Sequence, residues 1–243
     1  MANVNLYKYP FCNTGFCCCC DREVNFIAEK EWYRDWYICD NCKSIPRERA
    51  MMYIIETLYP DWEKLSIHES SPVMRGCSIK MKERCKGYIA TQFWANLPRG
   101  KIVSGFRNEN LEEQTFENNA FDIVVTQDVF EHLFNPNKGF AEIARTLKPG
   151  GAHIFTVPLI NKSGKSERWA RLGQNGEICF LHEPEFHGNP IDNNGSPVTY
   201  HWGNDIVDYI YNSCGMISTI YYIDNIELGI RAEYIEVIVS KKY

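Results

Sequence analysis

Four of the eleven cysteines have the spacing of a metal site, and seven of the eleven lie before residue 43. Cys17 and Cys20 are separated by two residues, as are Cys39 and Cys42, and 18 residues lie between the two pairs. A C-x2-C turn points two sulfur atoms at one ion, so two such turns complete a tetrahedral zinc site. Because four thiolates leave no coordination position open, this zinc is expected to be structural rather than catalytic.

The choice of ligands within the run from Cys17 to Cys20 is not fixed by spacing alone. Cys18 or Cys19 could bind if the turn shifted, and Cys12 is a weaker substitute. The alternative without a metal is a set of free, buried thiols. A segment this short has little core of its own, so a bound ion would supply much of its folding free energy.

A second set of polar side chains follows the apolar run FDIVVTQ, residues 121–127, which is typical of a buried strand. In doubly wound sheets the ligand lies at the carboxyl ends of the strands, so Gln127 and Asp128 are expected to border a crevice. Asp128 followed three residues later by Glu131 also has the pattern of a helix capping box, which needs no ligand. A cap at this edge would still face the crevice, so the two roles are compatible.

The elements that would position these residues alternate along the chain after Pro60. Short apolar runs are separated by helical patterns, which predicts parallel strands joined by crossover helices. The clearest helix lies in NKGFAEIARTLKPGG, where Pro149 and the two glycines after it form a stop signal. The predicted strands cover residues 65–70, 87–93, 101–105, 121–127, 152–158, 216–223 and 232–240.

The boundary between the cysteine-rich start and the rest of the chain falls at a predicted helix over residues 46–59. Ser44 is expected to cap this helix, and Pro46 suits its first turn. We expect the helix to link a zinc-binding segment, residues 1–45, to a main domain, residues 46–243.

The overall composition excludes several classes of partner. The formal net charge is −5, and the basic residues are scattered apart from a short cluster at residues 80–86, which is a poor footprint for nucleic acid. No stretch approaches the ~20 apolar residues that span a bilayer, and the start lacks the pattern of a secretory signal. We therefore expect a cytoplasmic protein with reduced thiols and no membrane partner.

The segment from Phe121 to Pro158, FDIVVTQDVFEHLFNPNKGFAEIARTLKPGGAHIFTVP, resembles the fourth strand, following helices and fifth strand of class I S-adenosylmethionine-dependent methyltransferases. Together with the strand and helix alternation, the resemblance covers residues from about 60 to 243. It implies an α/β, Rossmann-like fold with a seven-stranded, mostly parallel sheet whose last strand is antiparallel, preceded here by the small zinc knuckle.

The resemblance also implies an S-adenosylmethionine site along the strand ends. After the first strand the family has an acid and then a glycine-rich turn, and Glu69 keeps the acid. Ser70, Ser71 and Pro72 stand where glycines are usual. After the second strand an acid usually contacts the ribose, and Gln92 is the nearest polar residue here.

The remaining cofactor contacts are carried over in the same way. In RNENLEEQ the family has an acid or amide and then a leucine beside the adenine, and these positions are Asn110 and Leu111. The opposite wall is implied to hold Gln127, Asp128, Val129 and His132.

An unusually long insertion, residues 159–202, separates the fifth and sixth predicted strands, and long loops in compact domains tend to be functional. We expect it to form the acceptor site. A hydroxyl acceptor gains from a base with a pKa near neutral, so His187 is the first candidate for this base and His201 the second. The alternative for either histidine is that it ties the loop together. The string PEFHGNP within the insertion also resembles a bacterial subgroup found with glycan-synthesis genes.

The leading hypothesis is a cytoplasmic, bacterial methyltransferase that acts on a hydroxyl of a small-molecule or glycan acceptor, with S-adenosylmethionine as cofactor and a structural zinc. One alternative is a non-catalytic binding protein on a degenerate methyltransferase fold, which the missing glycines favour. The other is an RNA methyltransferase, which the acidic balance disfavours.

Overall fold

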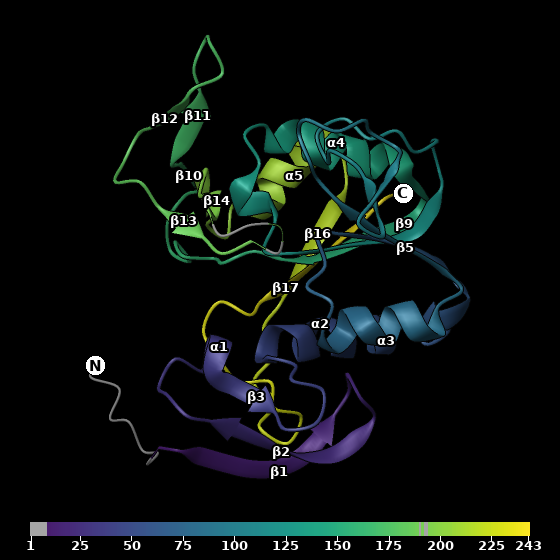
Figure 1. Ribbon diagram of the computed structural model, residues 1–243, viewed down its shortest axis with the longest axis vertical. Helices are drawn as coiled ribbons and strands as arrows, with labels where there is room; N and C mark the ends of the chain where they lie inside the picture. The colour runs from purple at the N-terminus through teal and green to yellow at the C-terminus, as the bar shows by residue number, and fades with distance from the viewer. Residues whose placement is uncertain (1–8, 190, 192–193) are drawn as a thin grey trace.

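An eight-stranded sheet forms the centre of the larger part of the molecule (Figure 1). The computed structural model describes residues 9–189, 191 and 194–243; the first eight residues of the cysteine-rich segment and residues 190, 192 and 193 of the insertion lie outside it. The strand order is β16-β17-β9-β8-β4-β5-β7-β6. The bounds are β4 Ser66–Ser70, β5 Gly87–Gln92, β6 Ile102–Val103, β7 Phe106–Asn108, β8 Phe121–Gln127, β9 Leu147–Thr156, β16 Ile217–Tyr221 and β17 Val237–Lys241.

The predicted direction of the strands is confirmed. Strands β7, β5, β4, β8 and β9 run parallel, and β17 is antiparallel to both of its neighbours. The region predicted as one strand, 101–105, forms only the two-residue edge strand β6. Ser104 and Gly105 both have positive φ, 49° and 85°, so the chain turns back and the parallel strand is β7. This hairpin adds the eighth strand.

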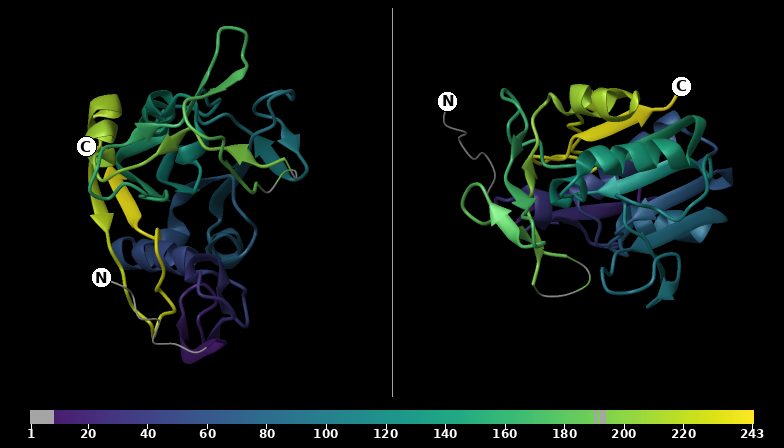
Figure 2. Two further views of the ribbon diagram at one scale, coloured as in Figure 1. Left: turned by 90° about the vertical axis from the view of Figure 1, so that its left-hand side faces the viewer. Right: turned by 90° about the horizontal axis from the view of Figure 1, so that it is seen from above.

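Helices cover both faces of the sheet (Figure 2). Helices α2, Pro46–Leu58, and α3, Gly76–Arg84, pack on one face in a core that includes Ile67 and Ile123. Helices α4, Pro136–Thr146, and α5, Ile206–Cys214, pack on the other face around Phe140.

The start of α2 differs from the prediction that Ser44 caps it. The N-cap residue is Ile45, whose backbone N–H donates to the Glu48 carboxylate over 3.2 Å. The Ser44 hydroxyl is instead 3.2 Å from Arg49 Nη1 and from Cys42 Sγ, so it is occupied by the cysteine-rich segment. Pro46 lies in the first turn, as predicted.

The cysteine-rich segment forms a three-stranded antiparallel sheet beneath α2 (Figure 1). Part of its apolar surface belongs to the same core as one face of the large sheet. Its elements are β1 Phe11–Cys17, β2 Arg22–Ala28, the single-turn α1 Tyr33–Trp36 and β3 Tyr37–Cys39.

The connection between β16 and β17, residues 222–236, reaches down to this small sheet, as both figures show. The Glu227 carbonyl accepts a hydrogen bond from the Phe16 N–H over 2.8 Å. A Cβ at Gly15 would lie 2.0 Å from that carbonyl oxygen, so a side chain there would block the contact. The fully buried Arg49 of α2 donates hydrogen bonds to the Gly229 and Tyr37 carbonyls. It thereby joins α2 both to the connection and to β3 of the small sheet.

In the described part of the insertion, short strands form the two-stranded pairs β10–β15, β11–β12 and β13–β14. Thr199 attaches it to the turn that follows the central strand β8, because its N–H donates to the Glu131 carbonyl and its hydroxyl to the Leu133 carbonyl. The bounds are β10 Glu167–Arg168, β11 Ala170–Leu172, β12 Ile178–Phe180, β13 Phe186–His187, β14 Ser196–Pro197 and β15 Tyr200–His201. Across the described residues, no helix has both the length and the apolar character needed to span a membrane.

Candidate functional site

A cavity of about 1090 Å³ lies at the carboxyl ends of the central strands. The strand ends form one wall, and the cysteine-rich segment, the start of α2 and the insertion supply the others. The predicted site residues on its lining are Ser70, Ser71, Gln92, Asn110, Leu111, Gln127, Asp128, Val129, His132 and His187. Glu69 and His201, which were predicted as site residues as well, are not among the lining residues.

Glu69 lies behind the wall of the cavity and is fully buried. Its carboxylate accepts hydrogen bonds from Ser78, Tyr88 and Gln127 over 2.7, 2.6 and 3.0 Å. Burial raises the pKa of Glu69 above its ordinary value, although these three donors oppose the shift. In this structure Glu69 therefore orients Gln127, which does line the cavity.

The turn after β4 keeps a glycine-like path without the usual glycines. Ser71 has a φ of 56°, in the left-handed region that glycine adopts most easily. Gly76, at φ 51°, begins α3 where a Cβ would lie 2.5 Å from the Glu48 carboxylate. The serines thus accommodate the turn, and the one remaining glycine stands where α2 and α3 approach closely.

Gln92 presents an unused acceptor at the wall. The side chain is 4% exposed, and its amide nitrogen donates to the Pro72 carbonyl over 3.2 Å. Its amide oxygen is buried and has no hydrogen-bond partner in the part of the chain that the structure describes. A buried amide oxygen without a partner is costly, so a ligand that donates a hydrogen bond here would be favoured.

Asp128 does not form the predicted capping box. The segment after it is a single 3-10 turn, Phe130–His132, whose N-cap is Val129 without a side-chain hydrogen bond. Asp128 has a φ of 51°, and its carboxylate accepts a hydrogen bond from the Thr156 hydroxyl over 2.9 Å. The prediction is wrong because distant partners take the carboxylate that a cap would use.

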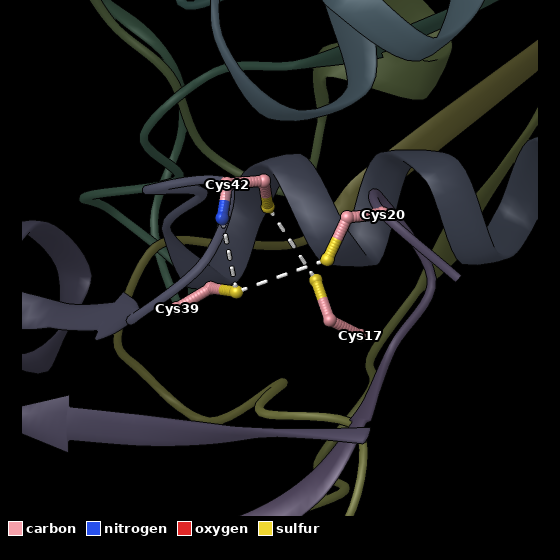
Figure 3. A group of neighbouring side chains, drawn as sticks. All are labelled: Cys17, Cys20, Cys39 and Cys42. Carbon is pink, nitrogen blue, oxygen red and sulfur yellow. Dashed lines mark hydrogen bonds between the residues drawn. The ribbon is translucent and has the colours of Figure 1, made fainter. Parts of the chain in front are cut away.

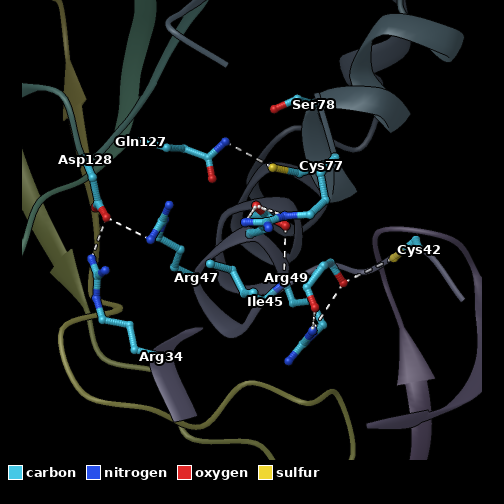
Figure 4. A network of polar contacts seen from close by, with 12 residues as sticks. Arg34, Cys42, Ile45, Arg47, Arg49, Cys77, Ser78, Gln127 and Asp128 are labelled. Atoms are coloured by element: carbon cyan, nitrogen blue, oxygen red, sulfur yellow. Dashed lines mark hydrogen bonds and ion pairs between the residues drawn. The ribbon is translucent and has the colours of Figure 1, made fainter. Parts of the chain in front are cut away.

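Those partners are two arginines from the start of the chain (Figure 4). Arg34 of α1 lies 2.5 Å and Arg47 of α2 lies 2.9 Å from the same Asp128 oxygen. Burial would raise the pKa of Asp128, but the charges of Arg47 and Arg34 outweigh it and hold the pKa well below the ordinary value. Asp128 therefore fixes the cysteine-rich segment against the cavity.

Sequence reasoning missed both arginines and the neighbouring Trp32, although all three line the cavity. The string EKEWYRDWY gave a signal in its concentration of aromatic and basic residues. No sequence pattern connected Arg34 in this string with Asp128, which lies 94 positions further along the chain. The Arg47 Nε is also buried and lacks a hydrogen-bond partner among the residues described.

At the end of the cavity formed by the insertion, two histidines are hydrogen-bonded to Glu185. One of its oxygens lies 3.1 Å from His187 Nε2, and the other lies 2.8 Å from His201 Nε2. His201 also stacks on Trp169 with ring centroids 3.8 Å apart, so it lies on the far side of Glu185 from the cavity. The Glu131 carboxylate and then Glu185 raise the pKa of His187 above its ordinary value, against the effect of burial.

The cysteines predicted as zinc ligands converge at one point (Figure 3). Their four sulfur atoms all lie within 4.8 Å of one another, with Cys17 and Cys42 3.7 Å apart and Cys20 and Cys39 4.0 Å apart. Sulfur atoms that are each about 2.3 Å from a tetrahedral zinc are separated by about 3.8 Å. The donor set and its size therefore fit zinc.

The other three cysteines considered as ligands lie outside this cluster. Cys18 donates to the Arg49 carbonyl over 3.2 Å, Cys19 is buried, and Cys12 is exposed on β1. None of the three belongs to the four-sulfur cluster.

Comparison with known proteins agrees with this architecture. Residues 80–155 match the family described as methyltransferase domain. The glycine/sarcosine/dimethylglycine N-methyltransferase of Actinopolyspora halophila is 31% identical over 78 residues, which make up 32% of this chain and 14% of that protein. The match therefore spans only a small part of this curated relative.

Among solved structures, the chain is similar to 1,6-didemethyltoxoflavin-N1-methyltransferase of Burkholderia thailandensis, determined with 1,6-didemethyltoxoflavin and S-adenosylhomocysteine bound. The TM-score is 0.51 at 10% identity, over 81% of this chain and 78% of that one. The strand order and this similarity define the Rossmann-like fold of the class I methyltransferases. The resemblance to S-adenosylmethionine-dependent methyltransferases that the sequence indicated is confirmed.

The ion pairs of Asp128 give a first prediction. Replacing Asp128 by Asn leaves two largely buried guanidinium groups facing a neutral amide, so we expect the free energy of unfolding to fall by about 3 kcal/mol. Denaturant unfolding measures this loss. Because the folded pKa is depressed, the contribution is fully present above the ordinary carboxyl pKa of about 4 and is lost as the pH falls toward the depressed value.

Asp224→Asn is the matched control, because Asp224 pairs with Arg231 on the exposed side of the connection. It should leave the unfolding free energy unchanged. Equal stability of the Asp128 variant and this control would contradict the role assigned to Asp128.

Proposed function

We propose that this protein transfers a methyl group from S-adenosylmethionine to a hydroxyl of a small-molecule or glycan acceptor. The observation that carries the proposal is the cavity at the strand ends, which combines unused polar atoms with room for two ligands. Its volume of about 1090 Å³ lies slightly above the usual range for small-molecule sites, ~300–1,000 Å³. We place the reaction in the cytoplasm.

The lining fits the parts of the cofactor. The unpartnered amide oxygen of Gln92 suits a ribose hydroxyl, which donates a hydrogen bond. Leu111, which is 5% exposed, and Asn110 would flank the adenine. Arg47, with its buried and unpartnered Nε, would bind the carboxylate of the methionine part.

At the other end, the chain would orient the acceptor. When bound, the cofactor supplies an electrophilic methyl group, and holding an oxygen in line with it accounts for much of the rate of such displacements. We assign activation of the acceptor hydroxyl to His187, which lines the cavity. His201 would position His187 through Glu185, to which both are hydrogen-bonded.

Cofactor binding gives the second prediction. Calorimetry should detect binding of both S-adenosylmethionine and S-adenosylhomocysteine to the purified chain. Gln92→Ala removes the proposed ribose acceptor and should weaken binding about tenfold, the equivalent of ~1.4 kcal/mol for one hydrogen bond. Gln174→Ala, on the exposed tip of the β11–β12 hairpin, should bind as the wild type does. A wild-type chain that binds neither compound would leave only a non-catalytic scaffold.

The third prediction concerns His187. His187→Ala should reduce transfer of labelled methyl groups into a cell extract of small molecules at least ~100-fold, the lower range for loss of acid–base catalysis. Its affinity for S-adenosylhomocysteine should not change. His182→Ala, which removes another histidine–carboxylate pair of the insertion, is the control. Full transfer by the His187 variant would exclude it from the reaction.

We also propose that the cysteine-rich segment, residues 1–45, is stabilised by a structural zinc ion held by Cys17, Cys20, Cys39 and Cys42. The segment contributes Trp32 and Arg34 to the cavity, so the metal would act on the cofactor site by holding these side chains in place.

Loss of this zinc is the fourth prediction. A thiol-blocking reagent should release zinc from the wild type but none from Cys42→Ser. Because metal binding supplies folding free energy, the cysteine-rich segment of this variant should also be cleaved by proteases. Cys12→Ser changes an exposed cysteine of the same sheet and should release as much zinc as the wild type. A wild-type chain without releasable zinc would refute the assignment.

A further inference from the structure

Glu131, His132 and His187 bring three potential metal ligands together at the acceptor end of the cavity. One atom of each lies within 4.8 Å of the others. His132 Nε2 and His187 Nδ1 are each 3.8 Å from the same Glu131 oxygen, Oε1. This distance is too long for a hydrogen bond, and it is near the separation of about 3.4 Å between two ligands that are each about 2.1 Å from a tetrahedral ion.

The outer nitrogen of each imidazole already has a partner. His132 Nδ1 lies 2.9 Å from the Pro197 carbonyl oxygen, which can only accept, so this nitrogen carries the proton. His187 Nε2 lies 3.1 Å from the Glu185 carboxylate, which accepts in the same way. In neutral imidazoles the inner nitrogens then bear lone pairs, and both face Glu131. Metal-bound histidines show this arrangement, in which a carbonyl or carboxylate fixes the ring from behind.

The Glu131 carboxylate gives an independent indication that this site binds a cation. The residue is 2% exposed, and neither carboxylate oxygen has a hydrogen-bond partner in the described chain. A buried carboxylate without a partner is strongly disfavoured. The nearby cation Arg34 is already used, because it pairs with Asp128 and donates to the Tyr234 carbonyl.

We propose that Glu131, His132 and His187 bind a divalent transition-metal ion, with Glu185 orienting His187 from behind. Two imidazoles and one carboxylate suit zinc, iron(II) or cobalt(II) better than magnesium, which prefers oxygen ligands only. Three protein ligands leave at least one coordination position open.

His132 and His187 line the cavity, so the open position borders the space assigned to the acceptor. If the acceptor hydroxyl bound to the ion there, its pKa would be lowered and its oxygen would be held toward the methyl donor. This role rests on the proposed methyl transfer, whereas the metal site itself does not. Activation of the acceptor by His187 would then act through the ion.

Titration with cobalt(II) tests the site on protein whose four-cysteine cluster is first filled with zinc. Zinc binds such a cluster more tightly than cobalt does, so added cobalt reports on nitrogen and oxygen ligands. The wild type should bind one cobalt ion per chain, with visible absorption that lacks a thiolate charge-transfer band. Glu131→Gln should weaken this binding at least ~100-fold, since loss of an indirect supporting residue alone costs 10–100-fold.

His187→Ala provides a second variant if the buried change prevents folding, because the His187 side chain is 34% exposed. His182→Ala, which removes a histidine of the same insertion, should bind cobalt as the wild type does. Absence of cobalt binding in the wild type, or equal affinity in the His187 variant, would overturn the metal site and would mean that protons on the imidazoles balance Glu131. Binding of S-adenosylhomocysteine in the same samples would show that the cofactor site is intact. The proposed methyl transfer would then not depend on the metal site.

Discussion

The Asp128 carboxylate at the end of the central strand β8 joins the two parts of the molecule. It lies where the fold places a ligand, yet it is bound by Arg34 and Arg47, which come from the cysteine-rich segment and the first long helix. All three side chains are between 11 and 14% exposed, so the charges interact in a medium that screens them poorly. The cavity therefore has a complete wall only when the start of the chain is folded against the sheet.

This arrangement connects the cysteine cluster to the cavity without any direct contact between them. The four sulfur atoms come together beside β3, and Arg49 joins β3, α2 and the connection before β17 by hydrogen bonds to backbone carbonyls. Arg34 and Arg47 are held in place by the elements that this network orders. A zinc ion in the cluster would thus stabilise the wall of the cavity from a distance, through the packed elements between them.

The sequence was informative wherever the determining contacts are local or follow a regular period. The strand ends at Ser70 and Gln127 could be predicted because buried parallel strands are continuous apolar runs, and the cluster of four cysteines because its spacing is local. The sequence could not show that the predicted capping box at Asp128 is wrong, because the arginines that bind Asp128 lie in other elements. The same holds for Glu131 and His187, which only the folding of the insertion over β8 brings together.

A crystal structure of the chain grown with S-adenosylhomocysteine would show whether the cavity binds the cofactor. We expect density for the nucleoside between Gln92 and Leu111, with the amino-acid end of the ligand near Arg47 and the thioether sulfur turned toward His187. A saturated crystal in which this cavity holds only solvent, or in which the protein's own side chains close it, would refute a cofactor site at the strand ends.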